Sequence, residues 1–189
     1  MRKLKRILIG LAIMFVALPA WAQLTDEQRK EQEIKAEKAR AENWARCTSD
    51  DPDLRISGCG AIIQAGSDSM TSLAIAYNNR GIAYNSKHLY DKAIADYTTV
   101  MALSPNNAGV FINRAWAYHL EGRDTEALPD ANKAVDLAPR SASIIETRAE
   151  IYEKLGQRDQ AIEDYRAALR LDPDDGRSQQ GLQRLGVAP

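Results

Sequence analysis

The two cysteines, Cys47 and Cys59, are the residues of this chain best suited to form a covalent bond. They are close in the sequence, and the turn-forming run 50–53 stands between them. Two thiols with no further ligand nearby do not make a zinc site, and a Cys-x-x-Cys redox motif is absent. We therefore expect one disulfide, which would pin the N-terminal helix to residues 54–64 and contribute about 3 kcal/mol. Two free thiols are the alternative.

No set of side chains typical of an active site occurs elsewhere in the sequence. The chain has two histidines, His88 and His119, and it lacks a glycine-rich phosphate loop, a nucleophile elbow and a His-Glu-x-x-His motif. Most acidic residues are expected to form surface ion pairs, such as Glu163 with Arg166. We expect a protein that is not an enzyme and that uses no metal and no other cofactor.

The segment 1–22 has the composition of a secretory signal peptide. Four basic residues occur before residue 7, residues 7–18 are predominantly apolar, and residues 20–22 offer a small-x-small cleavage site. The apolar run is shorter than the roughly 20 residues that a membrane helix needs. We expect cleavage after Ala22 and a periplasmic or secreted chain of bacterial type, without stable insertion of the mature chain into a membrane. An uncleaved anchor is the alternative.

Loss of this segment would change the charge balance. The whole sequence has 25 basic and 26 acidic residues, and residues 1–22 contain four of the basic ones and none of the acidic ones. The remaining chain therefore has 21 basic and 26 acidic residues, a net charge of −5. An acidic chain is a poor match for nucleic acid or anionic lipid, so we expect a protein or peptide as the partner.

Residues 23–46 predict a separate charged helix. Thr25 and Gln28 form the pattern of a capping box, and the run that follows is rich in helix formers and lacks Gly and Pro. Its apolar residues are too few for a sustained heptad pattern. We expect a solvated helix that docks only by its end, through Trp44. A coiled-coil or partner-binding helix is the alternative.

A 34-residue period dominates the rest of the chain. The recurring columns are Pro105, Pro139 and Pro173; Tyr84, Tyr118 and Tyr152; Ala93, Ala127 and Ala161; Arg80, Arg114 and Arg148; Asp96, Asp130 and Asp164; Leu103, Leu137 and Leu171; Gly81, Ala115 and Ala149. Apolar and small residues at spacings of three and four give each predicted helix one apolar face. A single helical pair cannot bury that face alone, so the period predicts stacked helix–turn–helix units.

Residues 74–175 resemble the tetratricopeptide repeat family. Beside the small residues, tyrosines, alanines and prolines above, the signature columns are Tyr77, Phe111 and Ile145; Tyr97, Ala131 and Tyr165; Val100, Ala134 and Ala168. The resemblance implies an all-α fold, an α-solenoid with repeats at residues 74–107, 108–141 and 142–175. The middle repeat departs from the pattern at Ala131, where the others have tyrosine, and at Pro129.

The segments beside the repeats are expected to close the stack. Residues 47–73 predict a disulfide-pinned N-terminal half-repeat, and residues 176–189 predict a polar capping helix and tail. Inside the repeats, we expect the second helices to begin at side-chain caps, Asp91 in the first repeat and Thr125 in the second. The repeated prolines are expected to end these helices.

In the family that the chain resembles, the first helix of each repeat lines a groove that takes an extended peptide or a helix. Carried over column by column, the groove residues are Asn78, Asn79, Ile82, Asn85, Ile112, Asn113, Trp116, His119, Glu146, Glu150 and Glu153. The basic residues that clamp a carboxylate in chaperone-binding members are missing, because Ser143 and Thr147 occupy two of those columns. Trp116 is the expected anchor, and the three glutamates favour a partner with basic residues.

These features together predict a periplasmic protein–protein interaction module, a scaffold or adaptor. Two alternatives remain open at this point. The chain could be a structural or assembly subunit of a cell-envelope complex, with the N-terminal helix as a second contact, or a regulatory partner of an envelope enzyme.

Overall fold

The computed structural model describes residues 24–66 and 69–188, and this part contains nine α-helices and no strand. The helices are α1 (Asp26–Cys47), α2 (Pro52–Ala65), α3 (Met70–Ser86), α4 (Tyr90–Leu103), α5 (Ala108–Leu120), α6 (Asp124–Leu137), α7 (Ala142–Lys154), α8 (Arg158–Leu171) and α9 (Gly176–Arg184). The described residues divide into two compact units, one that ends at Ala39 and one that begins at Arg40. The predicted signal segment 1–22 lies outside the described residues.

In the first unit, α1 begins with the capping box that the sequence predicts. The Thr25 amide donates to Gln28 Oε1 at 2.9 Å, and the Gln28 amide donates to Thr25 Oγ1 at 3.2 Å. Residues 26–39 are exposed, and Lys35 and Glu31 form an ion pair of 2.7 Å one helical turn apart. Ile34, the one large apolar residue of this stretch, is 59 % exposed. This part of α1 therefore has the surface of a solvated helix.

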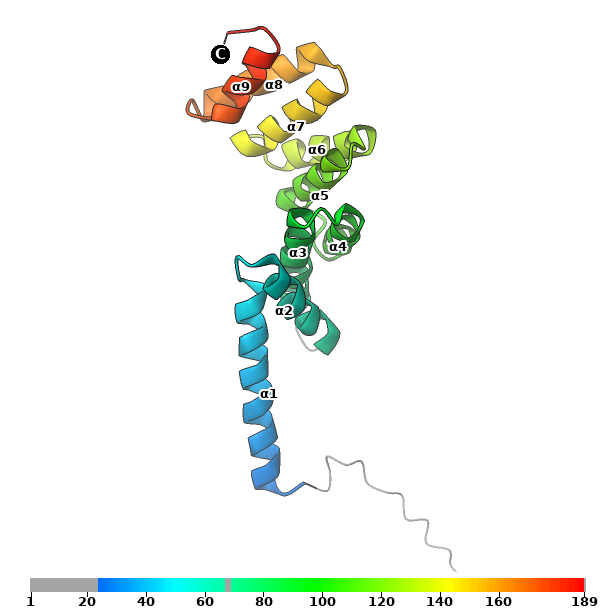
Figure 1. Ribbon diagram of the computed structural model, residues 1–189, viewed down its shortest axis with the longest axis vertical. Helices are drawn as coiled ribbons and strands as arrows, with labels where there is room; N and C mark the ends of the chain where they lie inside the picture. The colour runs from blue at the N-terminus through cyan, green and yellow to red at the C-terminus, as the bar shows by residue number, and fades with distance from the viewer. Residues whose placement is uncertain (1–23, 67–68, 189) are drawn as a thin grey trace, which may run out of the picture. The chain divides into compact units, whose positions relative to one another are not determined.

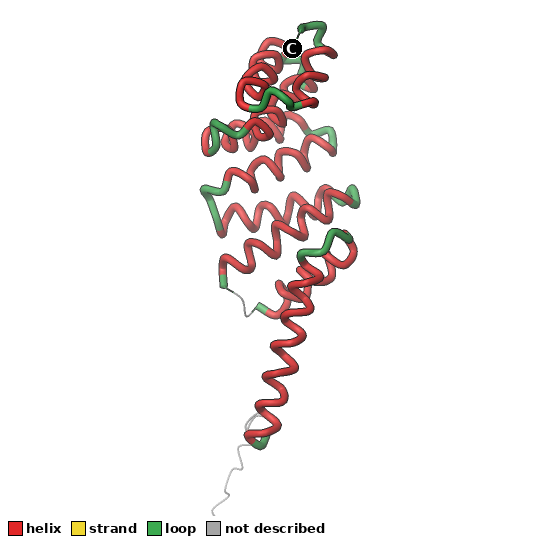
Figure 2. Tube along the Cα trace, turned by 90° about the vertical axis from the view of Figure 1, so that its left-hand side faces the viewer, coloured by secondary structure: helices red, strands yellow, loops and turns green. Residues whose placement is uncertain are grey.

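In the second unit, three helical pairs follow one another as α3/α4, α5/α6 and α7/α8 (Figure 1). We call α3, α5 and α7 the first helices and α4, α6 and α8 the second helices. The α2 helix packs before the first pair, and α9 follows the last (Figure 2). The solenoid of stacked helix–turn–helix units is confirmed.

The same tight turn joins the two helices of every pair. It is closed by backbone hydrogen bonds from Leu89 to Tyr84, from Arg123 to Tyr118 and from Gln157 to Tyr152, of 2.9, 2.8 and 2.9 Å. The residue before each of these donors has a positive φ: His88 (58°), Gly122 (78°) and Gly156 (72°). The turn itself starts the next helix.

The predicted side-chain caps of the second helices are therefore wrong. The α4 helix begins at Tyr90 and α6 at Asp124, one residue earlier than expected, and neither has a side-chain cap. Asp91 and Thr125 lie inside the first turn instead. The acidic residues of these first turns, Asp91 in α4 and Asp124 and Glu126 in α6, interact favourably with the positive end of the helix dipole.

The small residues of the period permit the two helices of a pair to cross closely. A Cβ atom on Gly81 would lie only 2.7 Å from the ring of Tyr97, so the packed ring leaves no room for a side chain at position 81. Gly81, Tyr97 and Ala93 are all buried. The equivalent alanines of the other repeats are buried as well.

In the middle repeat, Ala131 stands where the other two repeats have a tyrosine, and a residue of the next repeat packs beside it. Ala131 leaves room in the core, and Ile151 of α7 packs into the same buried cluster. The other first helices have alanine in that column, Ala83 and Ala117. A larger residue in the next repeat thus fills the space that the missing tyrosine leaves. Pro129 lies within α6 without interrupting it.

The arginine and aspartate columns form one bidentate pair in each repeat, a pairing that we did not predict. Arg80 with Asp96, Arg114 with Asp130 and Arg148 with Asp164 are joined by two hydrogen bonds each, of 2.7 to 2.9 Å. The aspartates are 5 to 7 % exposed. A carboxylate so buried needs a charged partner, so these columns are structural.

The arginines also connect successive repeats. Arg114 donates to Thr98 Oγ1 at 2.9 Å, and Arg148 donates to Asn132 Oδ1 at 3.2 Å. In both bonds, the acceptor belongs to the second helix of the repeat before.

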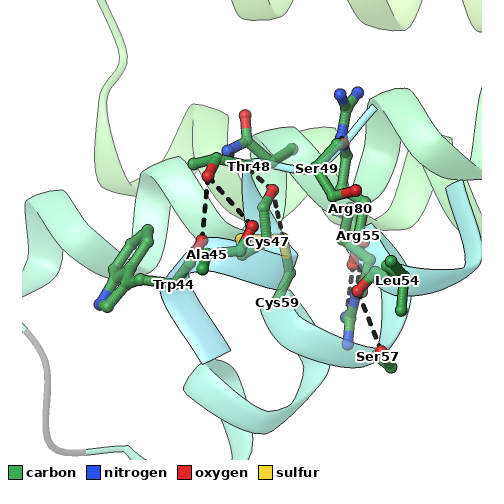
Figure 3. The surroundings of a disulfide bond; sticks show 12 residues. Trp44, Ala45, Cys47, Thr48, Ser49, Leu54, Arg55, Ser57, Cys59 and Arg80 are labelled. Atoms are coloured by element: carbon green, nitrogen blue, oxygen red, sulfur yellow. Dashed lines mark hydrogen bonds and ion pairs between the residues drawn. A yellow bond between two sulfur atoms is a disulfide. The ribbon is translucent and has the colours of Figure 1, made fainter. Parts of the chain in front are cut away.

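The disulfide joins Cys47 and Cys59, as predicted, with an S–S distance of 2.02 Å (Figure 3). Cys47 stands one full period before Gly81, and Cys59 stands one full period before Ala93. The bridge thus occupies the columns where the later repeats place two small residues at a helix crossing. Cys47 at the end of α1 and Cys59 in α2 are therefore in register with the columns of the later repeats.

Candidate partner-binding groove

Two of the hollows in the described part of the chain lie along the first helices, where the sequence predicts a groove. The first hollow has a volume of about 270 Å³ and lies between α3 and α5. It is lined by Ile82, Asn85, Ser86, Tyr97, Asn113, Trp116 and Leu120. Four predicted groove residues, Ile82, Asn85, Asn113 and Trp116, are therefore brought together.

The indole ring of Trp116 lines this hollow and is held in one orientation. Its indole is half-buried and stacks on the His119 imidazole, with ring centroids 5.0 Å apart and an interplanar angle of 28°. The imidazole Nδ1 in turn contacts Asp124 Oδ1, and both side chains are largely buried. Trp116 belongs to none of the four core clusters in the described part of the chain. Its indole is fixed in orientation while part of it stays accessible.

The wall of the first hollow contains an unused acceptor. Asn85 Nδ2 donates weakly to the Tyr97 hydroxyl at 3.4 Å, while Asn85 Oδ1 is buried without a hydrogen-bond partner. Burial raises the pKa of Tyr97 above its usual range, so this hydroxyl stays protonated. A buried amide oxygen without a donor is unfavourable. A small shift of the side chain would offer this oxygen to a ligand.

Three predicted groove residues have partners within the chain instead. Asn113 Nδ2 donates to Asn78 Oδ1 at 3.1 Å, which ties α5 to α3. Asn79 Nδ2 donates to the carbonyl of Cys47, at the end of α1, at 3.4 Å. Ile112 packs against the middle core cluster. The structure does not bring Asn78, Asn79 or Ile112 to either hollow.

The second hollow lies further along the stack and is mixed in charge. It has a volume of about 310 Å³ and is lined by His119, Glu150, Glu153, Lys154 and Arg184. Because Trp116 lines the first hollow and His119 the second, the stacked pair stands between them. A segment that entered both hollows would cross the Trp116–His119 pair.

Glu153 in the second hollow is already neutralised by α9. Arg184 donates to both carboxylate oxygens of Glu153 at 2.9 Å, and the Tyr165 hydroxyl donates to Oε2 at 2.7 Å. The Arg184 hydrogen bonds hold the pKa of Glu153 below its ordinary value. This glutamate is therefore a structural partner of α9 as well as part of the hollow.

Glu146 does not lie on an exposed face, which corrects our expectation. Its side chain is 0 % exposed, and neither carboxylate oxygen has a hydrogen bond. Arg177 of α9 forms an ion pair with it, but the Arg177 side chain is 54 % exposed. Burial and the neighbouring Glu150 raise the pKa of Glu146 to about 8. The α9 helix covers this residue, and it follows the last full period of the sequence.

Sequence reasoning missed the two arginines of α9, although a signal was present. Arg177 and Arg184 are seven residues apart, and so are Glu146 and Glu153. Residues seven apart lie on one face of a helix. Two helices with this matched spacing bring one arginine to each glutamate, and Arg184 neutralises Glu153 in this way.

A metal site and a membrane-spanning helix are both absent from the described residues. Residues 24–66 and 69–188 contain no group of three or more His, Cys, Asp or Glu side chains placed to hold a metal ion. No helix among them is long and apolar enough to cross a membrane.

Stacked helical pairs with hollows along their first helices define a helical-repeat scaffold. Models of the tetratricopeptide repeat match residues 74–107, 108–141 and 147–175, about half of the chain. The chain belongs to the tetratricopeptide repeat family. A search of curated protein sequences found no match.

Solved structures of the same fold include domains with bound peptides. The first such domain of Spaghetti (RPAP3), bound to an HSP90 peptide, is 28 % identical with a TM-score of 0.58, over 60 % of this chain and 90 % of that one. The second domain of human RPAP3, in complex with an HSP70 peptide, is 26 % identical with a TM-score of 0.60, over 62 % and 98 %. MamA from Desulfovibrio magneticus RS-1 is 20 % identical with a TM-score of 0.69, over 80 % and 84 %, and this likeness concerns the fold alone.

Proposed function

We propose that this chain is an exported protein–protein interaction module that holds a peptide or helix of a partner protein along α3, α5 and α7. The observation that carries the proposal is the hollow at Ile82, Asn85 and Trp116. It combines the oriented indole of Trp116, the aliphatic side chain of Ile82 and the buried amide oxygen of Asn85, which has no donor. An apolar side chain next to a backbone N–H group would satisfy all three.

The peptide complexes of RPAP3 domains support this use of the fold. Both structures have peptides bound to domains that are more than a quarter identical to this chain. Ser143 and Thr147 occupy two of the columns that clamp a terminal carboxylate in chaperone-binding members of the family, so the proposed ligand is an internal segment. Glu150 and Glu153 leave room for a basic residue beside the second hollow, although Arg184 already competes for Glu153.

Replacement of Leu120 by a photo-crosslinking residue tests whether the partner binds in the groove. Leu120 lines the first hollow and is 39 % exposed. We expect ultraviolet light to join it to a defined peptide segment of one partner in an envelope extract. The matched control is the same residue at Lys133, which is exposed on the second helix α6. Equal labelling from both positions, or labelling from Lys133 alone, would rule out the groove as the binding surface.

The export part of the proposal is supported by the composition of residues 1–22 and by the disulfide. N-terminal sequencing of the chain from a periplasmic extract or the medium should begin at Gln23. Recovery of Met1 from a membrane fraction would contradict it.

A further inference from the structure

The solvent face of α8 carries a stripe of four charged residues. Asp159, Glu163, Arg166 and Arg170 follow one another at spacings of four, three and four, so they lie on one face of the helix. All four are exposed. Within residues 24–66 and 69–188, no ion pair or side-chain hydrogen bond involves any of them. The ion pair of Glu163 with Arg166 that the sequence led us to expect is therefore not formed.

The acidic and basic residues of this stripe are separated along the helix. The two acidic residues stand in the first half of α8 and the two basic residues in the second half. The pair Asp159/Arg170 and the pair Glu163/Arg166 share one midpoint, between Asp164 and Tyr165. A two-fold axis through that midpoint would place each acidic residue opposite a basic residue of a second α8. A parallel arrangement in register would instead oppose like charges.

The stripe forms part of the lining of a depression that also contains two apolar side chains. Ile162 and Val187 line, with the four charged residues, a hollow of about 540 Å³. Both apolar side chains are partly exposed. The C-terminal segment is held in place because the Val187 amide donates to the Leu182 carbonyl at 2.9 Å and Arg158 Nη2 donates to the Leu185 carbonyl at 2.7 Å. A docking helix would meet an ordered surface.

The other second helices do not have this pattern. The four matching columns are Asp91, Ala95, Thr98 and Ala102 in α4, and Thr125, Pro129, Asn132 and Asp136 in α6. Thr98 and Asn132 are engaged by the arginine of the following repeat. The charged stripe is thus particular to α8 and is not a consequence of the repeat.

We propose that the stripe on α8 is a self-association surface, at which two copies of this chain pair their α8 helices antiparallel. Asp159 of each copy would then meet Arg170 of the other, and Glu163 would meet Arg166. Ile162 and Val187 would be buried beside these ion pairs. One helix face is a small area, so the dimer would be weak, with a dissociation constant on the order of 10 µM. The surface lies apart from the groove, and the proposal does not depend on the groove.

Charge reversal in the full chain tests the pairing by sedimentation velocity at about 10 to 300 µM protein. Wild type should dimerise, and E163R and R166E should each raise the dissociation constant about tenfold or more. An equimolar mixture of E163R and R166E should dimerise about as well as wild type, because every stripe residue then faces an opposite charge. The double variant E163R/R166E should likewise recover. Recovery on mixing also shows that the single variants are folded.

Three results would overturn the proposal. Wild type could remain a monomer at about 300 µM, far above the expected dissociation constant. The single variants could dimerise as tightly as wild type, which would place the contact elsewhere. The mixture could fail to recover while both variants keep the wild-type circular dichroism and melting temperature, which would exclude the antiparallel register. The matched control K133E, on the exposed face of α6, should leave the dimer unchanged.

Discussion

At the scale of single residues, Trp116 combines a fixed orientation with an accessible face. Trp116→Ala should weaken binding of the crosslinked partner peptide by about 2 kcal/mol or more, because the apolar anchor is lost. The free energy of unfolding should change by less than about 1 kcal/mol, since the indole is outside the core clusters. Calorimetric titration and urea unfolding of the same variant measure the two quantities.

Phe111→Ala is the control for this substitution. Phe111 packs against the first core cluster, so its loss should lower stability by about 3 kcal/mol without removing a groove contact. If Trp116→Ala instead destabilised the protein and left binding normal, the indole would be a packing residue and the groove proposal would fail.

Glu146 makes stability depend on pH in an unusual direction. Its pKa rises from an ordinary value of 4.5 to about 8 in the fold, so between these values the folded chain binds more protons than the unfolded chain. The stabilisation is complete below about pH 4.5 and is lost as the pH rises through 8. We expect a loss of about 2 kcal/mol, less than the full shift implies because the half-exposed Arg177 beside it admits solvent screening.

Glu146→Gln should remove this dependence and make the chain more stable than wild type at about pH 8.5. Urea unfolding at a series of pH values measures it. Glu153→Gln is the matched control, with the opposite sign. Arg184 lowers the pKa of Glu153, so its contribution is present above the ordinary carboxyl pKa and is lost in acid. An equal pH slope in wild type and Glu146→Gln would contradict the burial argument.

At the scale of helices, the middle repeat exchanges volume between α6 and α7. Ile151→Ala alone should cost about 3 kcal/mol, since it leaves a cavity beside Ala131. Ala131→Tyr alone should also destabilise the fold, because Ile151 occupies the space. The double variant restores the residues found in the first repeat, so it should cost clearly less than the sum of the two. Urea unfolding of all four chains completes the cycle, and simple additivity would show that the two sites do not share one space.

The repeated helices could be predicted because each column has the same packing role three times. The tyrosines, small residues and prolines are enough to place the helical pairs. The expected groove residues came from the family resemblance and not from the period. The starts of α4 and α6 could not be placed by a cap rule, because a backbone turn that begins at Tyr84 or Tyr118 determines them. The arginine–aspartate pairing was visible only as two columns, and nothing in the period alone brings them together.

The acidic end of the groove was the least predictable part. A helical-face argument places Glu146 beside Glu150 and Glu153, and this is correct within α7. Its burial depends on α9, which follows the last full repeat and shares few of its signature residues. The α8 stripe escaped notice for the opposite reason. Its charges have the composition of an ordinary solvated face, and only their lack of partners among the described residues draws attention to their order.

At the scale of the whole molecule, α9 closes one end of the stack. Leu182 is fully buried, and with Leu185 and Val187 it packs against the last core cluster. Deletion of residues 175–189 should lower the solubility and the melting temperature, because Tyr165 and its neighbours would face water. Light scattering and circular dichroism measure the two effects. A shortened chain as soluble and as stable as the full one would show that α9 is only a tail.

The position of the disulfide determines the end of the stack from which we expect the repeats to unfold. In an array where each unit contacts only its neighbours, opening starts at an end and spreads inward. The bridge ties the end of α1 to α2 covalently, whereas α9 is held by packing and ion pairs. Fraying and proteolytic nicking should therefore begin beside α9 and move toward α2. The hollow between α3 and α5 lies toward the tied end, so a bound segment there would keep its contacts after the last repeat had come apart.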